Sequence, residues 1–481
     1  MTPWIFLIPL AGALFLAVYG DRPWAFAANT AFSAATFAAA AMMTAHLLAH
    51  GPFAALHDQV FVNPLNAFFA DLTAFVTLTT SIFSRAYMRI ESHTGRLNPR
   101  RLRLYHSMFQ MFALTMLIAL LTNNIGILWV AMEGATLSTA LLVSLYRTPA
   151  SLEAAWKYFI LCGVGIALAL FGTIMVYFAA HALVGGQASL LWTNLDRIRA
   201  HLDPAIVGVA FAFLLLGYGT KVGLVPVHNW LPDAHAEGPT PISAVLSGLL
   251  LNVALYAVVR FKKLADGSLH SRWPNHLMMA FGLLSVLVAA FSLARQRDIK
   301  RLFSYSSIEH MGLATFAFGM GGPLANFAAL LHMTVHSLTK SSLFFSSGHI
   351  AQKTGTQDID QIGGLLGRNP AMGWALLLGS LAILGMPPFG VFTSEFLILT
   401  VTIHKELWAL PFLGVGLAVA FAALFGRTQS MVFGETRIPK APAPPSLWPS
   451  FLHLALVLLL GLSIPAILSA WYTAAARLLI H

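Results

Sequence analysis

Long apolar runs fill almost the whole chain, and short stretches rich in proline, glycine or charge separate them. Most runs reach the roughly 20 residues that a helix needs to cross a bilayer. A helix also satisfies its own backbone hydrogen bonds in lipid, where no water is present to do so. The pattern therefore predicts about 14 membrane-spanning helices, at residues 4–20, 25–48, 65–84, 105–122, 125–146, 155–181, 205–226, 240–261, 275–294, 304–321, 324–350, 371–401, 408–433 and 449–475.

The composition leads to the same class of protein. Of the 481 residues, 58% are hydrophobic and only 10% are charged, whereas soluble domains carry roughly 25% charged residues. So few charges cannot coat a soluble core of this size, which excludes a soluble enzyme and a nucleic-acid-binding protein. We therefore expect an all-α polytopic membrane protein, with residues 189–201 forming a short amphipathic helix in the membrane interface.

Arginine and lysine are unevenly distributed over the predicted loops. Loops of one parity carry most of them, and basic loops mark the cytoplasmic side. We therefore expect a protein of the bacterial cytoplasmic (inner) membrane with both termini on the non-cytoplasmic side. The first apolar run is expected to be a retained span, because it lacks the basic start and cleavage site of a signal peptide. The basic residues that decide the orientation are Arg85, Arg89, Arg96, Arg100, Arg101, Arg103, Arg295, Arg297, Lys300, Arg301, Arg427, Arg437 and Lys440.

Two predicted spans contain helix-breaking residues next to a charged one. The seventh is interrupted near Gly223 and Pro226, just after Lys221, and the twelfth near Gly385 and a proline pair, just before Glu395. The breaks lie five spans apart, and five is odd, so two five-helix units would have opposite orientations. Inverted-repeat transporters show this arrangement, with broken helices near the transport site. Two unrelated proline kinks are the alternative.

Several ionisable residues lie inside predicted spans, where each costs roughly 2.5–3.5 kcal/mol at the bilayer centre. Glu133 in the fifth span and Lys221 in the seventh have opposite signs, so a close pair can change between charged and neutral forms when a proton arrives. A static buried salt bridge is the alternative. Glu395 in the twelfth span is a further candidate. Asp71 and Glu309 are weaker ones, because they lie nearer the ends of their predicted spans.

His332, His336 and Lys340 are spaced four residues apart and therefore share one face of a helix. Two imidazoles and an amine in a row within lipid favour a proton relay. One alternative is a metal site, which lacks a clear third ligand, and another is a set of hydrogen-bonded packing histidines. Candidates for extending the row are His228, His235 and His349.

The single cysteine, Cys162, lies in an apolar run and is expected to pack there. One thiol cannot hold an iron–sulfur cluster, a zinc ion or a disulfide. Any redox centre must therefore belong to another protein.

Four segments carry a specific resemblance to a known family. They are GTKVGLVPVHNWLPDAHAEGPTPISAVLS at 219–247, DIKRLFSYSSIEHMG at 298–312, LHMTVHSLTKSSLFFSSGHI at 331–350 and GMPPFGVFTSEFLIL at 385–399. From about residue 60 to 435 the chain resembles the antiporter-like subunits of respiratory NADH dehydrogenase, of membrane-bound nickel–iron hydrogenases and of multisubunit Na+/H+ antiporters. Within this family it is most similar to the hydrogenase-4 branch.

The resemblance implies fourteen spans with two inverted five-helix repeats, spans 4–8 and 9–13. The implied domains are 1–103, 104–262, 275–435 and 448–481. It also implies that Glu133 and Lys221 gate one half-channel and that Glu395 ends the proton path. The implied central hydrophilic axis consists of His332, His336 and Lys340. Ser247 stands where many NADH-dehydrogenase relatives carry a histidine, so we expect water to bridge this point.

The resemblance favours a proton-translocating membrane subunit of a redox-driven complex of the hydrogenase-4 or formate hydrogenlyase type. The expected partners are other membrane subunits, the lipid bilayer and a peripheral cytoplasmic redox arm, without nucleic acid. We expect no cofactor or metal in this chain, since iron–sulfur, nickel or quinone groups would lie on partner subunits. The alternatives are an Mrp-type Na+/H+ antiporter subunit, the membrane subunit of an inorganic-carbon uptake complex, and a membrane anchor that moves no ions.

Overall fold

The computed structural model describes residues 2–435 and 447–480 of the chain. Arg437 and Lys440, two of the basic residues used for the orientation, lie outside these described residues. A two-stranded antiparallel hairpin, β1 (Phe53–Ala55) and β2 (Val60–Val62), follows the second helix. The helices are α1 (Trp4–Tyr19), α2 (Ala25–His50), α3 (Pro64–His93), α4 (Pro99–Leu121), α5 (Ile125–Val143), α6 (Pro149–Val184), α7 (Trp192–Ile198), α8 (Pro204–Val222), α9 (Trp230–Glu237), α10 (Thr240–Val245), α11 (Leu251–Leu269), α12 (Trp273–Leu293), α13 (Ile299–Met320), α14 (Pro323–Thr354), α15 (Leu365–Arg368), α16 (Pro370–Ile383), α17 (Gly390–Lys405), α18 (Leu410–Phe433), α19 (Trp448–Leu462) and α20 (Ala466–Arg477).

Several long helices begin at a capping residue that is followed at once by proline. Asn63 accepts hydrogen bonds from the backbone N–H groups of Leu65 and Asn66 at the start of α3. Asp203 caps α8 in the same way. The capping oxygen satisfies N–H groups that have no partner within the helix, and proline suits the first turn because it has no N–H to lose there. The Asn-Pro and Asp-Pro pairs of the sequence thus fix where these helices start.

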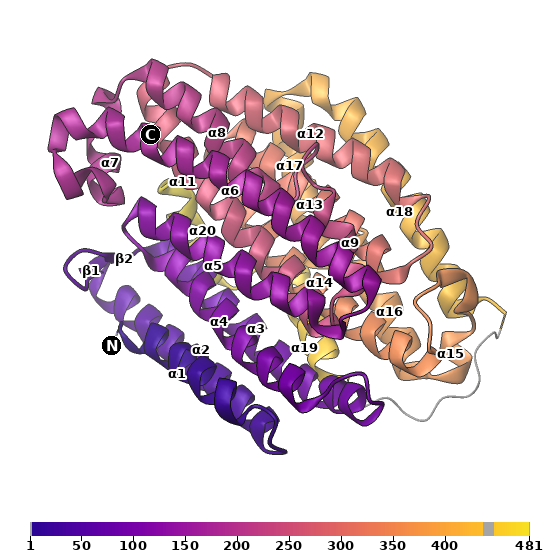
Figure 1. Cartoon of the computed structure of the whole chain (residues 1–481). Helices are drawn as coiled ribbons and strands as arrows, with labels where there is room; N and C mark the ends of the chain where they lie inside the picture. The colour runs from indigo at the N-terminus through magenta and orange to yellow at the C-terminus, as the bar shows by residue number, and fades with distance from the viewer. Residues whose placement is uncertain (1, 436–446, 481) are drawn as a thin grey trace.

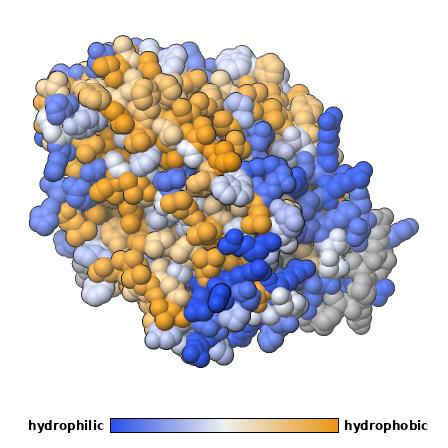
Figure 2. Space-filling view, viewed as in Figure 1, coloured by the Kyte–Doolittle hydropathy of each residue, from blue (hydrophilic) through white to orange (hydrophobic). Residues whose placement is uncertain are grey.

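The long helices lie side by side in one bundle (Figure 1). α14 packs against α3, α10, α13, α16, α17, α19 and α20, and nearly all of its side chains between residues 325 and 350 are buried. Both labelled chain ends lie toward the end of the bundle that carries β1, β2 and α7, whereas α15 lies toward the other end (Figure 1). Figure 2 shows apolar residues over most of the broad face and hydrophilic residues gathered toward its lower right. This distribution suits a bundle surrounded by lipid.

Nine helices of the described residues are long and apolar enough to cross a membrane, and the bent pair α19 and α20 would make a tenth. The multi-pass architecture is therefore confirmed, whereas the count of 14 spans is not. α13 and α14 are long but carry too many polar residues to qualify. α16 and α17 are the two short halves of the predicted twelfth span.

Both predicted helix breaks are present. α8 ends at Gly223, whose φ of +82° is easy only for a residue without a Cβ, and the chain runs irregularly from there to α9. The second break separates α16 from α17 and contains Gly385, with a φ of +64°. The positions of the breaks agree with the predicted inverted repeat, whose domain boundaries remain a prediction.

The predicted eighth span is present as the continuous stretch Thr240–Leu269, which contains a π-helical turn at Leu246–Leu250. Two other predicted features were wrong in detail. The last span is not one helix, because α19 and α20 meet at 80°, and Pro465 before α20 cannot continue the hydrogen bonding of α19. Glu309 lies in the middle of α13 rather than near an end, because α13 begins at Ile299, ahead of the predicted start at 304. The short helix predicted within 189–201 is present as α7.

Glycines let pairs of helices approach closely. An added Cβ on Gly282 of α12 would lie 2.6 Å from the backbone oxygen of Gly312 on α13. α6 and α8 meet in the same way, since a Cβ on Gly217 would lie 2.6 Å from the backbone oxygen of Gly165. Small residues at such contacts are a common means of packing helices in lipid. These two contacts set the positions of α8 and α13 in the bundle.

We expect Gly282→Ala to destabilise the protein by about 1–3 kcal/mol, the usual cost of overpacking a tight contact. The midpoint of thermal unfolding of the purified protein in mild detergent measures this effect. Gly414→Ala on α18 is the matched control, because an added Cβ there meets nothing within 4 Å. An unchanged midpoint for the Gly282 variant would contradict the close α12–α13 contact.

Candidate functional site

A band of ionisable side chains runs through the middle of the bundle. It draws on α5, α8, α9, α13, α14 and α17, so both predicted five-helix units contribute to it. Ionisable groups inside a membrane protein are rare, and they usually face one another or a water-filled cavity. The members of this ionisable band are buried or half-buried, and they are Glu133, Lys221, His235, Glu309, His310, His332, His336, Lys340 and Glu395.

At one end of the band, Thr136 on α5 contacts Lys221 on α8. The fully buried Lys221 ammonium donates to the Thr136 hydroxyl. The same hydroxyl donates to the backbone oxygen of Met132 at 3.1 Å, one turn before it on α5. No ion pair within 4.0 Å joins Glu133 to Lys221, and Glu133 Oε2 has no hydrogen-bond partner among the described residues. Lys221 is thus held by a hydroxyl of α5, the helix that carries Glu133, and the direct salt bridge considered as an alternative is not formed.

The helix break at Gly223 provides a favourable place for Lys221. Lys221 stands in the last turn of α8, where the backbone carbonyls lack helical partners and the helix dipole favours a positive charge. Without the break, this helix end would not lie inside the bundle. The sequence therefore places the lysine and the glycine next to each other for an electrostatic reason.

A pair of hydroxyls connects the first predicted unit to the second. Ser247, in the π-helical turn before α11, lies 2.8 Å from Ser307 on α13, oxygen to oxygen, and both are fully buried. The expected histidine position is therefore occupied by a serine with a hydroxyl partner. Neither hydroxyl carries a charge, so the two predicted units meet here through uncharged side chains.

A histidine cluster forms the centre of the second unit. Nδ1 of His310 lies 3.2 Å from Nε2 of His332, and the two rings are stacked with centroids 5.2 Å apart. His336 lies next to them, with its centroid 5.8 Å from that of His310. His332 also faces the Ser394 hydroxyl on α17, with 2.9 Å from Nδ1 to the oxygen. One turn after His336 on α14, the Lys340 ammonium donates to the backbone oxygen of Phe303 at 3.0 Å.

Glu395 closes the band at its other end. Its Oε1 lies 3.8 Å from Nδ1 of His310. Glu395, His310 and Glu309 together line a cavity of about 400 Å³ between α13, α17 and α18. The break before α17 makes room for the carboxylate, because a Cβ on Gly385 would collide with it. The cavity is large enough for several waters, each of which takes up roughly 30 Å³.

The other predicted candidates lie in different parts of the structure. His235 on α9 is fully buried, and its ring packs on Phe344 of α14 with centroids 5.1 Å apart, so it belongs to the band. His228 lies before α9 with its ring 6.4 Å from that of Tyr305. His349 lies away from the band beside Phe83 and Gln352. Asp71 lines a different cavity, between α3, α14 and α19.

The sequence reasoning missed one member of the ionisable band and misplaced one buried lysine outside it. His310 was not a candidate, although it touches both His332 and Glu395. The signal was available in SIEHMG, where Glu309 and His310 are adjacent titratable residues within one predicted span. Lys300 was assigned to a loop, but it is buried at the start of α13 and donates to the backbone oxygen of Gly238 at 2.8 Å.

No group of three or more His, Cys, Asp or Glu side chains in the described part of the chain is arranged to hold a metal ion. The His332–His336 pair has His310 as a neighbour, and these three rings stack and tilt against each other instead of converging on one point. Cys162 is buried as a free thiol.

The chain belongs to the family described as NADH:quinone oxidoreductase/Mrp antiporter, transmembrane, which matches residues 122–421. That range contains the whole ionisable band and confirms the resemblance found in the sequence. The chain is 49% identical over 469 residues to a protein named hydrogenase-4 component F homolog from Methylacidiphilum infernorum (isolate V4), with 97% of each chain covered.

Two solved structures share the fold. One is a chain of the membrane-bound sulfane sulfur reductase, an archaeal respiratory membrane complex, with a TM-score of 0.90 and 23% identity over 100% of this chain and 97% of that chain. The other is a chain of the Mrp complex from Dietzia sp. DQ12-45-1b, with a TM-score of 0.84 and 18% identity over 99% and 96% of the two chains. They confirm the all-α polytopic membrane fold.

Proposed function

We propose that this chain is a proton-translocating membrane subunit of a redox-driven complex of the hydrogenase-4 or formate hydrogenlyase type. The observation that carries the proposal is the ionisable band, which places titratable groups of both predicted units in one buried row. Groups of this kind are costly in a membrane and mark ion or proton routes when they occur there. The family and the 49% identical relative support the same function.

The histidine cluster has the geometry that proton transfer needs. A neutral imidazole accepts a proton on its unprotonated nitrogen and can release a proton again to a second partner. His310 and His332 are already at hydrogen-bonding distance, 3.2 Å. The 3.8 Å gap between His310 and Glu395 is closed by a small movement or by one water in the adjoining cavity. Nδ1 of His310 faces both partners, so this one nitrogen would accept the proton from His332 on α14 and then release it to Glu395 on α17.

The Glu133–Lys221 pair can act as the charge gate of the first unit. Adding or removing a proton at this pair changes its net charge, and the low dielectric of the interior lets such a change act over longer distances than in water. His235 of the first predicted unit and Lys340 of the second are close enough to interact electrostatically. A change of charge at one unit therefore alters the proton affinity of the next.

The redox chemistry is proposed to take place on partners, because the described residues offer no metal-binding cluster and the chain has one cysteine. The partners would be other membrane subunits and a peripheral cytoplasmic arm carrying iron–sulfur, nickel or quinone groups. The distribution of basic residues over the loops supports a bacterial cytoplasmic membrane as the location, with both termini on the non-cytoplasmic side. The labelled chain ends at one end of the bundle agree with this placement (Figure 1).

An Mrp-type Na+/H+ antiporter subunit is the second candidate, and the fold shared with the Dietzia Mrp complex favours it. The two candidates differ in their partners. Purification of the tagged protein from its native membranes in mild detergent, followed by mass spectrometry, separates them. We expect hydrogenase-like or quinone-reductase-like subunits with iron–sulfur motifs to copurify. Recovery of small antiporter subunits without redox proteins would move the function to the second candidate.

We expect Glu133→Gln and Lys221→Ala each to reduce proton pumping by the assembled complex to background. Both variants remove a titrating group, and the glutamine variant does so at nearly constant shape. Pumping is measured with a pH-sensitive dye in inverted membrane vesicles, and the amount of complex is measured by immunoblot. Glu153→Gln on the exposed start of α6 is the control and should pump normally. Full pumping by Glu133→Gln would show that its charge is not needed.

We expect His310→Leu to lower proton pumping by about tenfold or more, since positioned proton donors and acceptors contribute factors of roughly 10² or more in transfer reactions. Among the described residues His310 is the group that contacts both His332 and Glu395. His453→Leu is the control, because His453 is equally buried but bonds to Thr79 and Leu338 outside the band. Equal pumping by the two variants would remove His310 from the route.

A further inference from the structure

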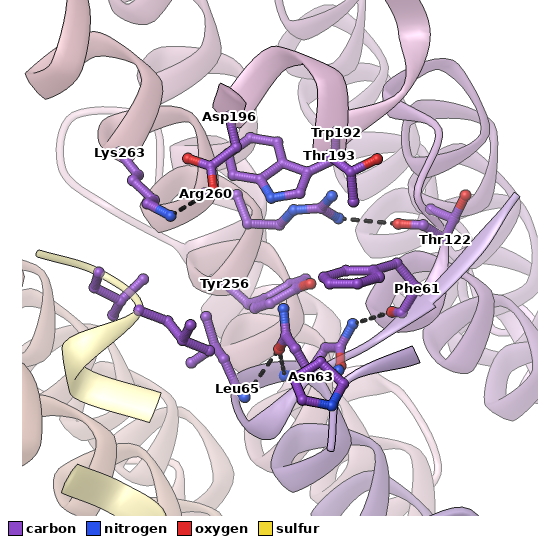
Figure 3. Close-up of a pocket in the computed structure, with 14 residues that line it drawn as sticks. Phe61, Asn63, Leu65, Thr122, Trp192, Thr193, Asp196, Tyr256, Arg260 and Lys263 are labelled. Carbon is purple, nitrogen blue, oxygen red and sulfur yellow. Dashed lines mark hydrogen bonds and ion pairs between the residues drawn. The ribbon is translucent and has the colours of Figure 1, made fainter. Parts of the chain in front are cut away.

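A polar pocket lies at the end of the bundle that carries β1, β2 and α7, away from the ionisable band. It is enclosed by β2, the start of α3, α7, α11 and the residues after α20 (Figure 3). Its cavity measures about 180 Å³. The side chains that define it are Phe61, Asn63, Trp192, Asp196, Arg260 and Lys263.

Arg260 is fixed in the wall of this pocket. Its guanidinium lies over the Trp192 ring at 4.4 Å and near the Tyr256 ring at 5.6 Å, measured to the centroids. One N–H donates to the backbone oxygen of Thr122 at 3.2 Å. Figure 3 shows the guanidinium between the two aromatic rings, with its bond to Thr122. Because the side chain is 5% exposed, its remaining N–H donors are turned toward protein and pocket rather than toward bulk water.

The charge of Arg260 is not balanced by a carboxylate of the described residues. None of them lies within 4.0 Å of its guanidinium. The acidic residue of the pocket, Asp196, is already engaged by Lys263 at 2.7 Å and by Arg199 at 2.6 Å. The pocket wall therefore carries an excess of positive charge. A buried cation without a counter-ion is unfavourable, so an anion in the adjoining cavity would stabilise this arrangement.

We infer that this pocket binds a phosphate group beside Arg260. A guanidinium offers a planar set of donors that matches a phosphate, and Lys263, which is paired with Asp196, also lines the pocket. Two sources share this chemistry, the headgroup of an anionic phospholipid and free inorganic phosphate. The apolar part of the lining, with Leu65, Leu478 and Leu479, favours the lipid, whose chains can follow that side of the pocket.

The first test uses the unchanged full chain, purified in mild detergent and stripped of lipid by extensive washing. Phosphatidylglycerol and inorganic phosphate are added separately, and diacylglycerol serves as the lipid without phosphate. The midpoint of thermal unfolding and native mass spectrometry report binding. We expect phosphatidylglycerol to raise the midpoint and to remain bound as one retained molecule, and diacylglycerol to do neither. If neither phosphatidylglycerol nor inorganic phosphate has an effect, the inference is wrong.

The second test places the binding at Arg260. We expect Arg260→Gln to reduce phosphatidylglycerol occupancy by about tenfold or more, the usual effect of removing a charged hydrogen-bond donor. Arg260→Lys keeps the charge but not the planar set of donors, so its phosphatidylglycerol occupancy should lie between those of the wild type and Arg260→Gln. Arg197→Gln on the exposed side of α7 is the control for loss of a positive charge at the same end and should bind normally.

The outcomes also show whether the phosphate group belongs to a phospholipid headgroup or to free inorganic phosphate. Stabilisation of the wild type by inorganic phosphate alone, lost in Arg260→Gln, supports the site with free phosphate as its ligand. Retention of phosphatidylglycerol that depends on Arg260 supports the lipid headgroup. Equal lipid and phosphate binding by the wild type and both Arg260 variants overturns the inference, because the binding would then lie elsewhere.

Discussion

An ammonium group taken out of water needs hydrogen-bond acceptors close by, or its burial is too costly for the fold. Lys221 and Lys340 both meet this requirement with an oxygen on a neighbouring helix. Lys221 on α8 donates to Thr136 on α5, and Lys340 on α14 donates to the backbone oxygen of Phe303 on α13. Each buried lysine therefore connects two helices, and the positions of these four helices depend on the two contacts.

The helix breaks and the glycine contacts make those positions possible. The break at Gly223 brings a helix end, with its free carbonyls, to Lys221 inside the bundle. The break at Gly385 leaves space for the Glu395 carboxylate beside His310. The close approach of α12 and α13 at Gly282 and of α6 and α8 at Gly217 then holds the helices that carry these residues. In each unit, a tight glycine contact and a loosened helix end occur together.

Much of this arrangement could be predicted from the sequence, because apolar runs and buried charges are local features of the chain. The broken spans, Glu133, Lys221 and the row from His332 to Lys340 were all evident from spacing and composition. His310 was missed because its importance comes from α13 packing against α14 and α17, which no local pattern reveals. Arg260 was missed for a similar reason, because its partners Thr122 and Trp192 are distant from it in sequence. The last span was predicted as one helix because hydropathy does not register an 80° bend at a proline.

The junction between the two units limits how they can communicate. Ser247 and Ser307 meet there through their hydroxyls, and a hydroxyl does not hold an extra proton near neutral pH. A proton therefore cannot rest at this point as it can on His332 or Glu395. Two means of communication remain, which are transient passage along hydroxyls and water and the electrostatic effect of one unit's charge on the other. The second needs no proton to cross the junction at all, so under the proposed function the charges at Lys221 and Lys340 suffice to couple the two predicted units.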